Sequence, residues 1–453
     1  MDEVAAIFEP RRVVLVGSSV IREKVGMASP QLFRSVIHNV KKYFHGRAYA
    51  LDINGKASSK KSSDELPETP ELAVIMLPPK QSITHVEKCA KTGIKTFVII
   101  TGGYSDQQRE QLFKLKRKYH VRVLGPNTIM GVINTANGLN TTFERDTMPK
   151  KGSIAVISQS GGVGACLLDW ACFYGIGISK FAFMGDKIDV DDVDLLRYLG
   201  KDKGTKVICL YMEGVKNGRK FIEEARKIVR EKPILALKGG ITQEAAHRAK
   251  SHTASVAGSD KIFDAALKKA GIIRTENVEE LMDAAIALSK QPQMRGDNVA
   301  VVSNVGGPAI LAADAVARNN LKLATLSEKV KSKIEGLYPG VDATNPIDVI
   351  ADARADRYER VLELVLADKN VDGVLIINML KSCFFEPKDA RVIPKVAAKY
   401  PDKPVVDVPA GGEDFALVHK VLGNTSIPLY DLPEKAVKAL KVLRTYSKIA
   451  KKH

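Results

Sequence analysis

Residues 154–165 have the sequence IAVISQSGGVGA, and residues 299–310 have the sequence VAVVSNVGGPAI. In each stretch an apolar run leads into a polar pair, two glycines and the beginning of a helix. The two copies lie about one domain length apart, so they predict two related α/β units. The segment VVLVGSS at 13–19 begins a further unit in the same manner, with an apolar run that ends in a glycine turn.

Short apolar runs alternate with helical patterns along the rest of the chain, which is typical of parallel sheets flanked by helices. The polar stretches MPKKG at 148–152 and QPQMRGDN at 291–298 separate the units. We therefore predict three open α/β units in series, with domains at 1–148, 149–291 and 292–453. The predicted strands lie at 12–17, 72–77, 95–100, 121–124, 153–158, 206–212, 233–237, 298–303, 373–377 and 404–408.

The composition is that of a globular protein of 453 residues, with 45% hydrophobic and 27% charged residues. Apolar residues are spread over the whole chain, which argues against disorder. No apolar run approaches the ~18 residues that span a bilayer, and the N-terminal MDEVAAIFEPRRVV lacks the order of regions of a signal peptide. The five cysteines form no CxxC pair, so we expect reduced thiols and a cytoplasmic location.

Lysine and arginine together number 69, against 52 aspartates and glutamates, which gives a net charge of +17. Such an excess fits either a nucleic-acid-binding protein or a protein that gathers phosphorylated ligands or docks an acidic subunit. The basic residues are dispersed, and the aromatic residues (6%) do not alternate with them as a base-stacking surface requires. We therefore expect no nucleic acid among the ligands.

Each glycine turn lies between a strand and a helix, where backbone N–H groups and the helix N-terminus converge on one point and suit a phosphate. The turn at 160–162 (SGG) offers the most donors. The turn at 17–19 (GSS) departs from the GxGxxG pattern, and a strand–helix turn that needs small residues explains it equally well. Pro308 removes one donor from the third turn, for which we favour a structural role.

His252 lies in the segment KSHTASVAGSD (250–260), among small and hydroxyl side chains. A histidine in such a loop is free to approach a reacting phosphorus, although most loop histidines have no such role. Phosphorylation of an imidazole needs a carboxylate to hold its other N–H, and Glu213 directly follows an apolar strand, where active-site groups of open α/β sheets gather. The acidic run at 186–194 is the alternative, but it is more typical of a solvated, capped helix start. His247 lies five residues before His252, not four as in a zinc-binding HExxH helix, so we expect no metal site.

Seven segments taken together resemble one known family: VVLVGSS, VLGPN, ISQSGGVG, LYMEG, SHTASVAGSD, SNVGGP and NPID. They are similar to the α subunit, or α part, of the nucleoside-diphosphate-forming acyl-CoA synthetases, such as the ADP-forming acetate–CoA ligases of archaea, which are relatives of succinyl-CoA synthetase. The similarity extends over essentially the whole chain. It implies a Rossmann-like CoA-binding domain followed by two flavodoxin-like CoA-ligase domains. It also implies the reaction acyl-CoA + ADP + phosphate ⇌ carboxylic acid + CoA + ATP, through an acyl phosphate and a phosphohistidine.

The resemblance assigns the phosphorylated nucleophile to His252, and to Glu213 the role of orienting its imidazole and balancing its charge. It assigns phosphate binding to Ser160, Gly161 and Gly162 at a helix N-terminus. The residues that it implies for CoA and the thioester are Gly17, Ser18 and Ser19 near CoA, Lys24 or Lys56 on its phosphates, Pro78 by the adenine, Thr101 and Gly102 by the pantetheine, and Asn127 by the thioester.

The sequence departs from the family pattern at four places. SHTASVAG has Ala254 where a glycine is usual, which stiffens the loop, and INGK at 53–56 replaces VNPK, which weakens the assignment of the lysine there. Asp106 stands where glutamate is common. Asp186, in a segment that is usually GNK, adds a negative charge near the expected phosphate site. We expect these changes to alter the acyl pocket and to leave the phosphoryl chemistry intact.

Fused family members carry an ATP-grasp portion that binds the nucleotide, whereas this sequence ends in a basic helical segment after residue 440. We therefore expect ADP or ATP, with Mg²⁺, to bind a separate ATP-grasp β subunit in an α2β2 assembly. The alternative from another class is a non-catalytic CoA- or acyl-CoA-sensing protein of the same fold, but a sensor has no use for the pair His252 and Glu213.

Overall fold

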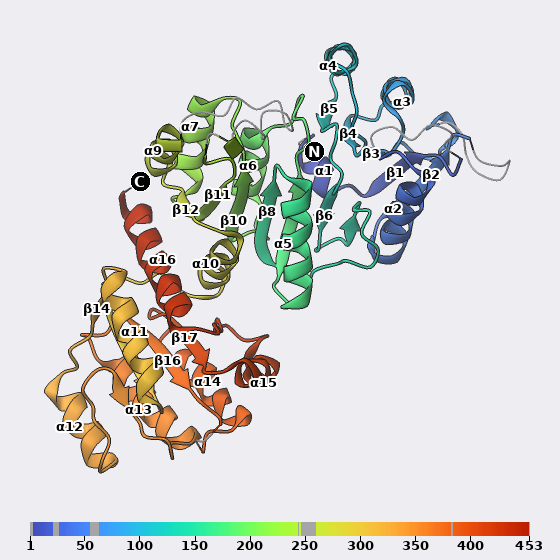
Figure 1. Ribbon diagram of the computed structural model, residues 1–453. Helices are drawn as coiled ribbons and strands as arrows, with labels where there is room; N and C mark the ends of the chain where they lie inside the picture. The colour runs from blue at the N-terminus through green and yellow to red at the C-terminus, as the bar shows by residue number, and fades with distance from the viewer. Residues whose placement is uncertain are drawn as a thin grey trace. The chain divides into compact units, whose positions relative to one another are not determined.

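The computed structural model describes residues 3–20, 27–54, 63–242, 244–245, 260–381 and 384–452. The expected site residues Lys24, Lys56 and His252 lie outside these ranges. The chain divides into two compact units, Met1–Glu276 and Asn277–His453 (Figure 1). Within the described ranges the named strands form three sheets, of which the first two belong to the first unit.

The first sheet is formed by the segment up to Leu124. Its elements are α1 (Ala5–Phe8), β1 (Arg12–Gly17), α2 (Pro30–Tyr43), β2 (Arg47–Asp52), η1 (Ser63–Glu65), β3 (Leu72–Ile75), α3 (Pro79–Lys91), β4 (Thr96–Ile99), α4 (Asp106–Tyr119) and β5 (Arg122–Leu124). The strands are parallel in the order β2-β1-β3-β4-β5. The chain leaves β1 for β2 on one side and returns to β3 on the other. The carboxyl ends of β1 and β3 therefore form the topological switch point at which such sheets bind ligands.

The second sheet continues the first unit. Its elements are β6 (Val132–Asn134), β7 (Leu139–Asn140), β8 (Lys151–Ser158), α5 (Gly161–Phe173), β9 (Ile178–Phe183), α6 (Asp192–Lys201), β10 (Val207–Met212), α7 (Gly218–Ile228), β11 (Ile234–Lys238), α9 (Asp260–Ala270) and β12 (Ile273–Thr275). The order is β12-β11-β10-β8-β9-β6-β7, and β6 joins β9 in antiparallel fashion. The hairpin β6–β7 thus belongs to the second sheet although it precedes the polar stretch at 148–152. The switch point of this sheet lies between β8 and β10.

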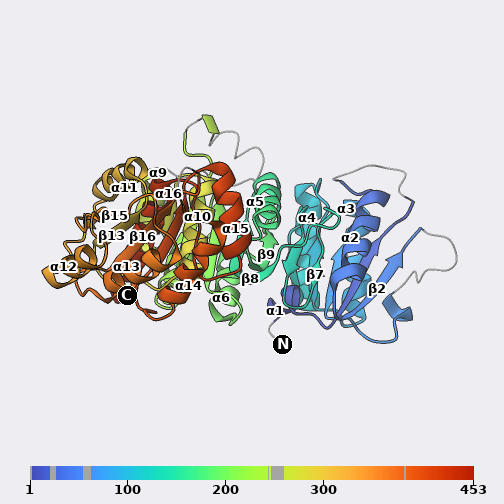
Figure 2. The same cartoon turned by 90° about the horizontal axis from the view of Figure 1, so that it is seen from below.

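Helices cover both faces of the second sheet. Figure 2 shows α5 on one side and α6 on the other, with β8 and β9 between them. α5 packs on β8 and β9, while α6 packs against α7 and α7 against α9. A parallel sheet covered on both faces buries its central strands, which is why β10 and the second half of β8 are buried and mostly apolar.

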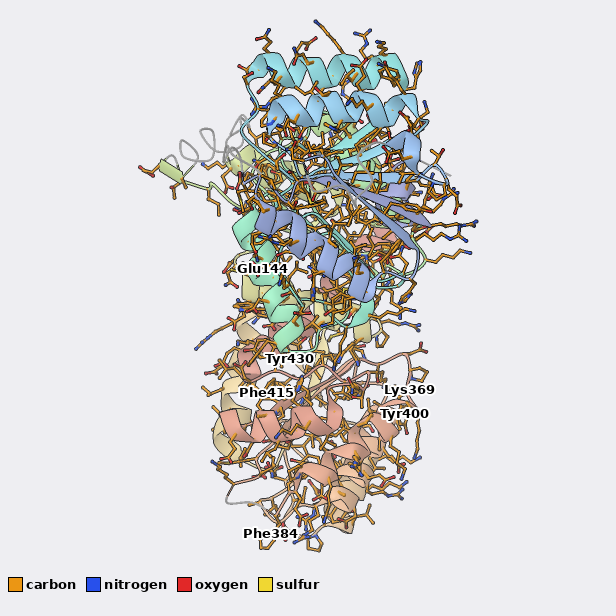
Figure 3. The ribbon with its side chains drawn as sticks, turned by 90° about the vertical axis from the view of Figure 1, so that its right-hand side faces the viewer. Glu144, Lys369, Phe384, Tyr400, Phe415 and Tyr430 are labelled. Atoms are coloured by element: carbon orange, nitrogen blue, oxygen red, sulfur yellow. The ribbon has the colours of Figure 1, made fainter. Side chains whose placement is uncertain are left out.

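The second unit is a three-layer α/β structure. Its elements are α10 (Val278–Lys290), β13 (Asn298–Ser303), α11 (Gly306–Arg318), β14 (Lys322–Leu323), α12 (Glu328–Leu337), β15 (Ile347–Asp348), α13 (Ala355–Ala367), β16 (Gly373–Asn378), η2 (Pro387–Arg391), α14 (Val392–Ala397), β17 (Val405–Pro409), α15 (Gly412–Leu422) and α16 (Pro433–Lys452). The parallel order is β14-β13-β16-β17, with β15 paired to β13. α10, α11 and α16 pack on one face and α13, α14 and α15 on the other. Tyr430, labelled in Figure 3, is buried in the first of these layers and donates to the carbonyl of Asp283 (3.0 Å).

The α/β class predicted from the sequence is confirmed by these sheets. Each predicted strand is present, and its ends lie within two residues of the expected ones. Among the described residues, no helix combines the length and the apolar character that crossing a membrane requires.

Candidate active site

The N-terminus of α5 forms an open turn at the carboxyl end of β8. Ser160 is the N-cap residue, and its Oγ accepts a hydrogen bond from the N–H of Val163 (3.4 Å). A Cβ at Gly162 would meet no atom within 4 Å, and one at Gly161 would lie 3.6 Å from the ring of Phe183. The first N–H groups of the helix are therefore accessible. Such groups, together with the helix dipole, favour an anion such as phosphate.

Glu213 directly follows β10, the strand beside β8, and lines the same cavity as this turn. The cavity holds about 1140 Å³ of empty space, including the solvent at its mouth, and its lining includes Asn127, Ser160, Gly161 and Gly162. One carboxylate oxygen of Glu213, Oε2, is buried and lacks a hydrogen-bond partner among the described residues. Burial and the nearby carboxylate of Glu213 raise the pKa of Tyr211 to about 12. Glu213 therefore combines a buried acceptor that lacks a donor with a place in the lining of the same cavity as the α5 turn.

Gln159, which the sequence analysis did not single out, joins these two turns. Its Oε1 accepts hydrogen bonds from the N–H groups of Glu213 (2.7 Å) and Gly214 (3.1 Å). Its own N–H donates to the carbonyl of Tyr211 (3.1 Å). A polar residue between a buried strand and the SGG turn was the available signal for it in the sequence.

Asn127 reaches the cavity from the segment that follows the first sheet. It follows a cis peptide bond between Gly125 and Pro126 and has a positive φ of 66°. Its N–H donates to the carbonyl of Thr101 (2.9 Å). A Cβ at Gly102 would lie 2.5 Å from Asn127 Oδ1. Gly102 is therefore needed for the close packing of the Asn127 side chain.

Asp186 also lines the cavity and adds a second carboxylate to it. It forms an ion pair with Arg109 of α4, whose Nη2 lies 3.0 Å from Asp186 Oδ2 and whose Nη1 lies 3.0 Å from Asp106 Oδ1. Asn127 Nδ2 donates to Asp186 Oδ1 (3.3 Å). An anion at α5 would face this ion pair, not an isolated carboxylate.

The rest of the acidic run differs from the solvated helix start that the sequence suggested. Asp191 does cap α6, in a capping box with Asp194. Asp189, however, has a buried side chain that pairs with Lys116 (2.7 Å) and Arg122 (3.0 Å) of the first-sheet segment. The ion pairs of Asp189 therefore connect the segments of the two sheets in the first unit. The basic partners of Asp189 lie too far away in the sequence to be recognised from local spacing.

The turn after β1 contains the residues expected nearest to CoA. A Cβ at Gly17 would lie 2.2 Å from the ring of Phe33, so the packing of α2 on the strand requires glycine there. Ser18 is fully buried, and its Oγ donates to a carbonyl within the same turn (2.7 Å). The N–H of Ser19 donates to Asp52 Oδ1 (2.9 Å) at the end of β2.

Pro78 and Thr101 lie beyond β3 and β4 at the same edge of the sheet. Pro78 is the N-cap residue of α3. Thr101 is buried, and its Oγ1 donates to the carbonyl of Leu77 (2.6 Å). The hydroxyls of Ser18 and Thr101 are thus both used within the protein.

The corresponding turn of the second unit, after β13, is held by side-chain hydrogen bonds. Asn304 accepts a hydrogen bond from the N–H of Met379 (2.9 Å) and donates to its carbonyl (3.0 Å). Asn345, the first residue of the NPID segment, accepts from the N–H of Val301 (2.9 Å) and donates to the carbonyl of Val299 (2.8 Å). The side chain of Asn345 thus braces β13, which accounts for this segment structurally.

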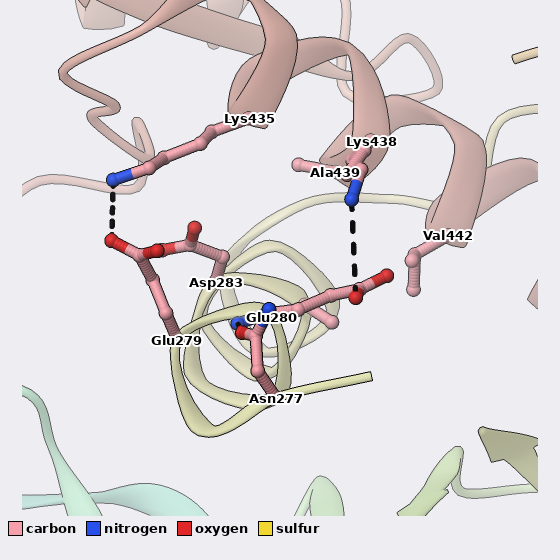
Figure 4. A pocket seen from close by; sticks show the side chains of 9 residues that line it. Asn277, Glu279, Glu280, Asp283, Lys435, Lys438, Ala439 and Val442 are labelled. Carbon is pink, nitrogen blue, oxygen red and sulfur yellow. Dashed lines mark hydrogen bonds and ion pairs between the residues drawn. The ribbon is translucent and has the colours of Figure 1, made fainter. Parts of the chain in front are cut away.

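A second cavity lies between α10 and α16 of the second unit (Figure 4). Lys435 donates to Glu279 (2.5 Å), and Lys438 lies 3.9 Å from Glu280. Burial raises the pKa of Asp283, which also lines this cavity, to about 7. The cavity contains none of the expected site residues. In the parts of the chain that the structure describes, no three His, Cys, Asp or Glu side chains are grouped as metal ligands.

The fold and the cavity define a CoA-ligase architecture. Three family models match successive parts of the chain. A CoA binding domain matches residues 11–134, a succinyl-CoA ligase like flavodoxin domain matches 151–288, and a ligase-CoA domain matches 299–452. The second match includes both the SGG turn and Glu213, and the first includes the turn after β1.

Known proteins give the family. The chain is 35% identical to the alpha subunit of ADP-forming acetate–CoA ligase I of Pyrococcus furiosus, over 99% of this chain and 98% of that one. It is 35% identical to ADP-forming acetate–CoA ligase I of Archaeoglobus fulgidus over 98% of this chain, but covers 64% of that longer protein. It resembles the dinucleotide forming acetyl-coenzyme A synthetase 1 of Ca. Korarchaeum cryptofilum, solved with phosphate and ADP, with a TM-score of 0.90 and 30% identity over 100% of this chain and 98% of that one. The chain belongs to the family of ADP-forming acetate–CoA ligase α subunits. The expected Rossmann-like CoA-binding domain followed by two flavodoxin-like ligase domains is confirmed.

Proposed function

We propose that this chain is the α subunit of an ADP-forming acyl-CoA synthetase of the acetate–CoA ligase type, with the reaction acyl-CoA + ADP + phosphate ⇌ carboxylic acid + CoA + ATP. The observation that carries the proposal is one cavity that combines an open helix N-terminus with Glu213, whose buried Oε2 has no partner among the described residues. Relatives named for this activity cover the chain almost from end to end. A protein that only senses CoA is not favoured, because burying an unpaired carboxylate oxygen is costly and needs a use.

In the first step, phosphate would bind at Ser160, Gly161 and Gly162, where the N–H groups of α5 neutralise its charge. A phosphate oxygen attacks the thioester carbon, the C–S bond breaks, and CoA leaves as the thiolate. Asn127 lines the same cavity and would lie beside the thioester. The residues proposed to surround CoA are Gly17, Ser18, Ser19, Pro78, Thr101 and Gly102, with Lys24 or Lys56 on its phosphates.

In the second step, His252 would receive the phosphoryl group. A neutral ring nitrogen forms the N–P bond while the P–O bond to the acyl group breaks and the carboxylate leaves. Glu213 Oε2 would accept a hydrogen bond from the other ring N–H, which fixes the reactive tautomer and balances the developing positive charge. The phosphoryl group then passes to ADP.

We assign ADP, ATP and Mg²⁺ to an ATP-grasp β subunit in an α2β2 assembly. One relative is named as an alpha subunit, whereas the longer Archaeoglobus relative extends well beyond the region that this chain covers, and both facts support a divided enzyme. We also propose the domain limits 1–148, 149–291 and 292–453. Three separate sheets support three domains, while the hairpin β6–β7 joins the second sheet and α10 belongs to the second unit, so neither element follows these limits. A cytoplasmic location is supported by the buried free thiols of Cys89 and Cys209.

Labelling of the full chain with acetyl-CoA and ³²P-labelled phosphate tests the function. The wild type should acquire an acid-labile, alkali-stable label, and His252→Ala should acquire none. Glu213→Gln should label at least ~10²-fold more slowly, the usual contribution of a positioned acid–base group. Glu144→Gln, at an exposed glutamate of the same unit labelled in Figure 3, is the matched control and should label like the wild type. Label that persists in His252→Ala would exclude this histidine as the nucleophile.

A further inference from the structure

Gln159 uses every hydrogen-bonding position of its side-chain amide. It lies between the last residue of β8 and the N-cap of α5 and is 4% exposed. Besides accepting from the N–H groups of Glu213 and Gly214, it donates through Nε2 to the carbonyl of Gly214 (2.8 Å) and to Asp192 Oδ1 (2.8 Å). Two accepted and two donated bonds are the full capacity of an amide. One side chain therefore holds the turn that bears Glu213.

The amide of Gln159 donates to a carboxylate, Asp192, that is itself part of a buried ion pair with Lys187. Lys187 Nζ donates to Asp192 Oδ2 (3.0 Å) and to the carbonyl of Gly214 (3.1 Å). Lys187 and Asp192 are 8% and 3% exposed. Because one oxygen of Asp192 serves Gln159 and the other serves Lys187, the three side chains and the Gly214 carbonyl form a closed ring. The ring also fixes the orientation of the amide, since a flipped Gln159 would set its oxygen against two acceptors.

The Glu213 turn combines a clamped backbone with a free side-chain oxygen. Both N–H groups at 213 and 214 are bound to Gln159, while Glu213 Oε2 is buried and has no partner in the described part of the chain. Gln159 also directly precedes Ser160 in the chain, so one residue links the anion-binding turn to the turn that carries the carboxylate. Fixed donors and acceptors of this kind are what a preorganised site requires.

We propose that Gln159 is a positioning residue of the phosphoryl-transfer site, and that Asp192 and Lys187 hold it in place. It keeps the carboxylate of Glu213 at a constant position relative to the N-terminus of α5. The inference rests on the proposed function, in which Glu213 holds the imidazole that receives the phosphoryl group. Loss of the clamp lets the Glu213 turn shift, which slows phosphoryl transfer and leaves CoA binding at the first sheet unchanged.

The second unit contains an equivalent clamp that lacks the carboxylate. Asn304 has the position of Gln159 in the sequence repeat, and its side chain bonds both the N–H and the carbonyl of Met379. Met379 follows β16 as Glu213 follows β10. Asn304→Ala therefore removes a similar structural clamp from the other unit, at a turn that lacks the carboxylate, and it is the matched control.

The test measures the rate of label transfer from ³²P-labelled acetyl phosphate to His252 in the full chain, together with the CoA Kd and the melting temperature. Gln159→Ala and Gln159→Glu should slow labelling by ~10–100-fold, as a small misplacement of a reacting group does, while the CoA Kd stays at the wild-type value. Asn304→Ala should lower the melting temperature and leave the labelling rate unchanged. Equal slowing by Asn304→Ala, or a wild-type rate in Gln159→Ala, would overturn the inference.

A double variant that exchanges the amide of Gln159 with the acid of Asp192 makes the test independent of how well Gln159→Ala folds. In Gln159→Glu the new carboxylate faces Asp192 and the Gly214 carbonyl, which are both acceptors. Adding Asp192→Asn gives position 192 an amide that can donate to the carboxylate at position 159, and one negative charge remains near Lys187. The double variant should therefore regain at least ~10-fold of the lost labelling rate. No regain would also count against the inference. Label on wild-type His252 with no effect at Gln159 refutes only the positioning role, whereas an unlabelled wild type refutes the proposed function as well.

Discussion

Asp407, on β17 of the second unit, is a buried carboxyl group with an unusual partner. It accepts a 2.6 Å hydrogen bond from Asn378 Nδ2. Asp407 Oδ2 and Asn378 Oδ1 are both buried without a partner among the described residues. Burial raises the pKa of Asp407 to about 8. A proton on Asp407 supplies the donor that a carboxylate lacks, so we infer that this group is neutral at pH 7.

Asp407→Asn should remove a pH dependence of stability. An unfolded aspartate has a pKa of about 3.9, so between about pH 4 and pH 8 the folded chain keeps a proton that the unfolded chain releases. The free energy of unfolding of the wild type should therefore fall as the pH rises through this window, by about 1.4 kcal/mol per pH unit. An amide can donate at every pH, so the variant should show a shallower slope and be the more stable protein near pH 8.

Urea unfolding at several pH values measures these slopes. Asp402→Asn, at an exposed aspartate of the same unit, is the control and should follow the wild type. Identical slopes for Asp407→Asn and the wild type would show that Asp407 is ionised in the folded chain.

At the scale of the element, the N-terminus of α6 depends on a side-chain cap. Asp191 Oδ1 accepts hydrogen bonds from the N–H groups of Val193 (2.9 Å) and Asp194 (3.2 Å). Asp191→Ala should lower the free energy of unfolding by about 1 kcal/mol, the usual cost of losing such a cap. Asp106→Ala, in the first turn of α4 with a fully exposed side chain, should change it by less than about 0.5 kcal/mol. Thermal unfolding measures both variants. If Asp191→Ala lowers the free energy of unfolding as little as Asp106→Ala does, the cap of α6 does not contribute to stability.

The central strands of the sheets could be predicted from the sequence because they are buried on both faces and therefore continuously apolar. β2 was not predicted, since it lies at an edge and is exposed over its first residues. β9 was missed for another reason. It is buried throughout, but Lys180 interrupts its apolar run, and the charge is compensated by a 2.8 Å ion pair with Asp202 that local sequence does not reveal.

Some residues of the candidate site could likewise be predicted from the sequence, and others could not. Glu213 and the SGG turn could be placed together, because adjacent parallel strands end at one edge of the sheet and both segments follow apolar runs. Gln159 could not be given a role, since that role depends on Asp192 and Lys187, which local spacing does not connect to it. The contribution of Asp186 was likewise hidden until its ion pair with Arg109 was known.

At the scale of the whole molecule, the chain has a net charge of +17, but the described lining of the cavity carries none of its basic side chains. None of the described residues that line the cavity is a lysine or an arginine. Lys116, Arg122 and Lys187, which lie near the acidic run, are all paired with its aspartates. Among the described residues, the phosphate binding that we propose for this cavity would therefore depend on backbone N–H groups and the dipole of α5. The remaining positive charge is available for the phosphates of CoA, for an acidic partner subunit or for solvation.

The division of labour between subunits gives the last prediction. If the chain supplies the thioester and phosphohistidine chemistry and its partner supplies the nucleotide site, the full chain alone should label His252 from acetyl-CoA and phosphate but should not pass the label to ADP. Addition of an ATP-grasp β subunit with Mg²⁺ and ADP should discharge the label into ATP. The expected rate with the β subunit is that of a working enzyme, on the order of 1–10³ s⁻¹.

A chase experiment separates the two half-reactions. The labelled chain is freed of phosphate and mixed with Mg²⁺ and ADP, with or without the β subunit, and the label is followed in protein and in ATP. His252→Ala with the β subunit should form no ATP, because the phosphoryl group has no carrier between the acyl phosphate and the nucleotide. ATP formed by the chain alone would place the nucleotide site within this chain and remove the argument for a separate subunit. Discharge that requires the β subunit, with equal amounts of both chains in the active complex, would establish that transfer from His252 to ADP is a reaction between subunits.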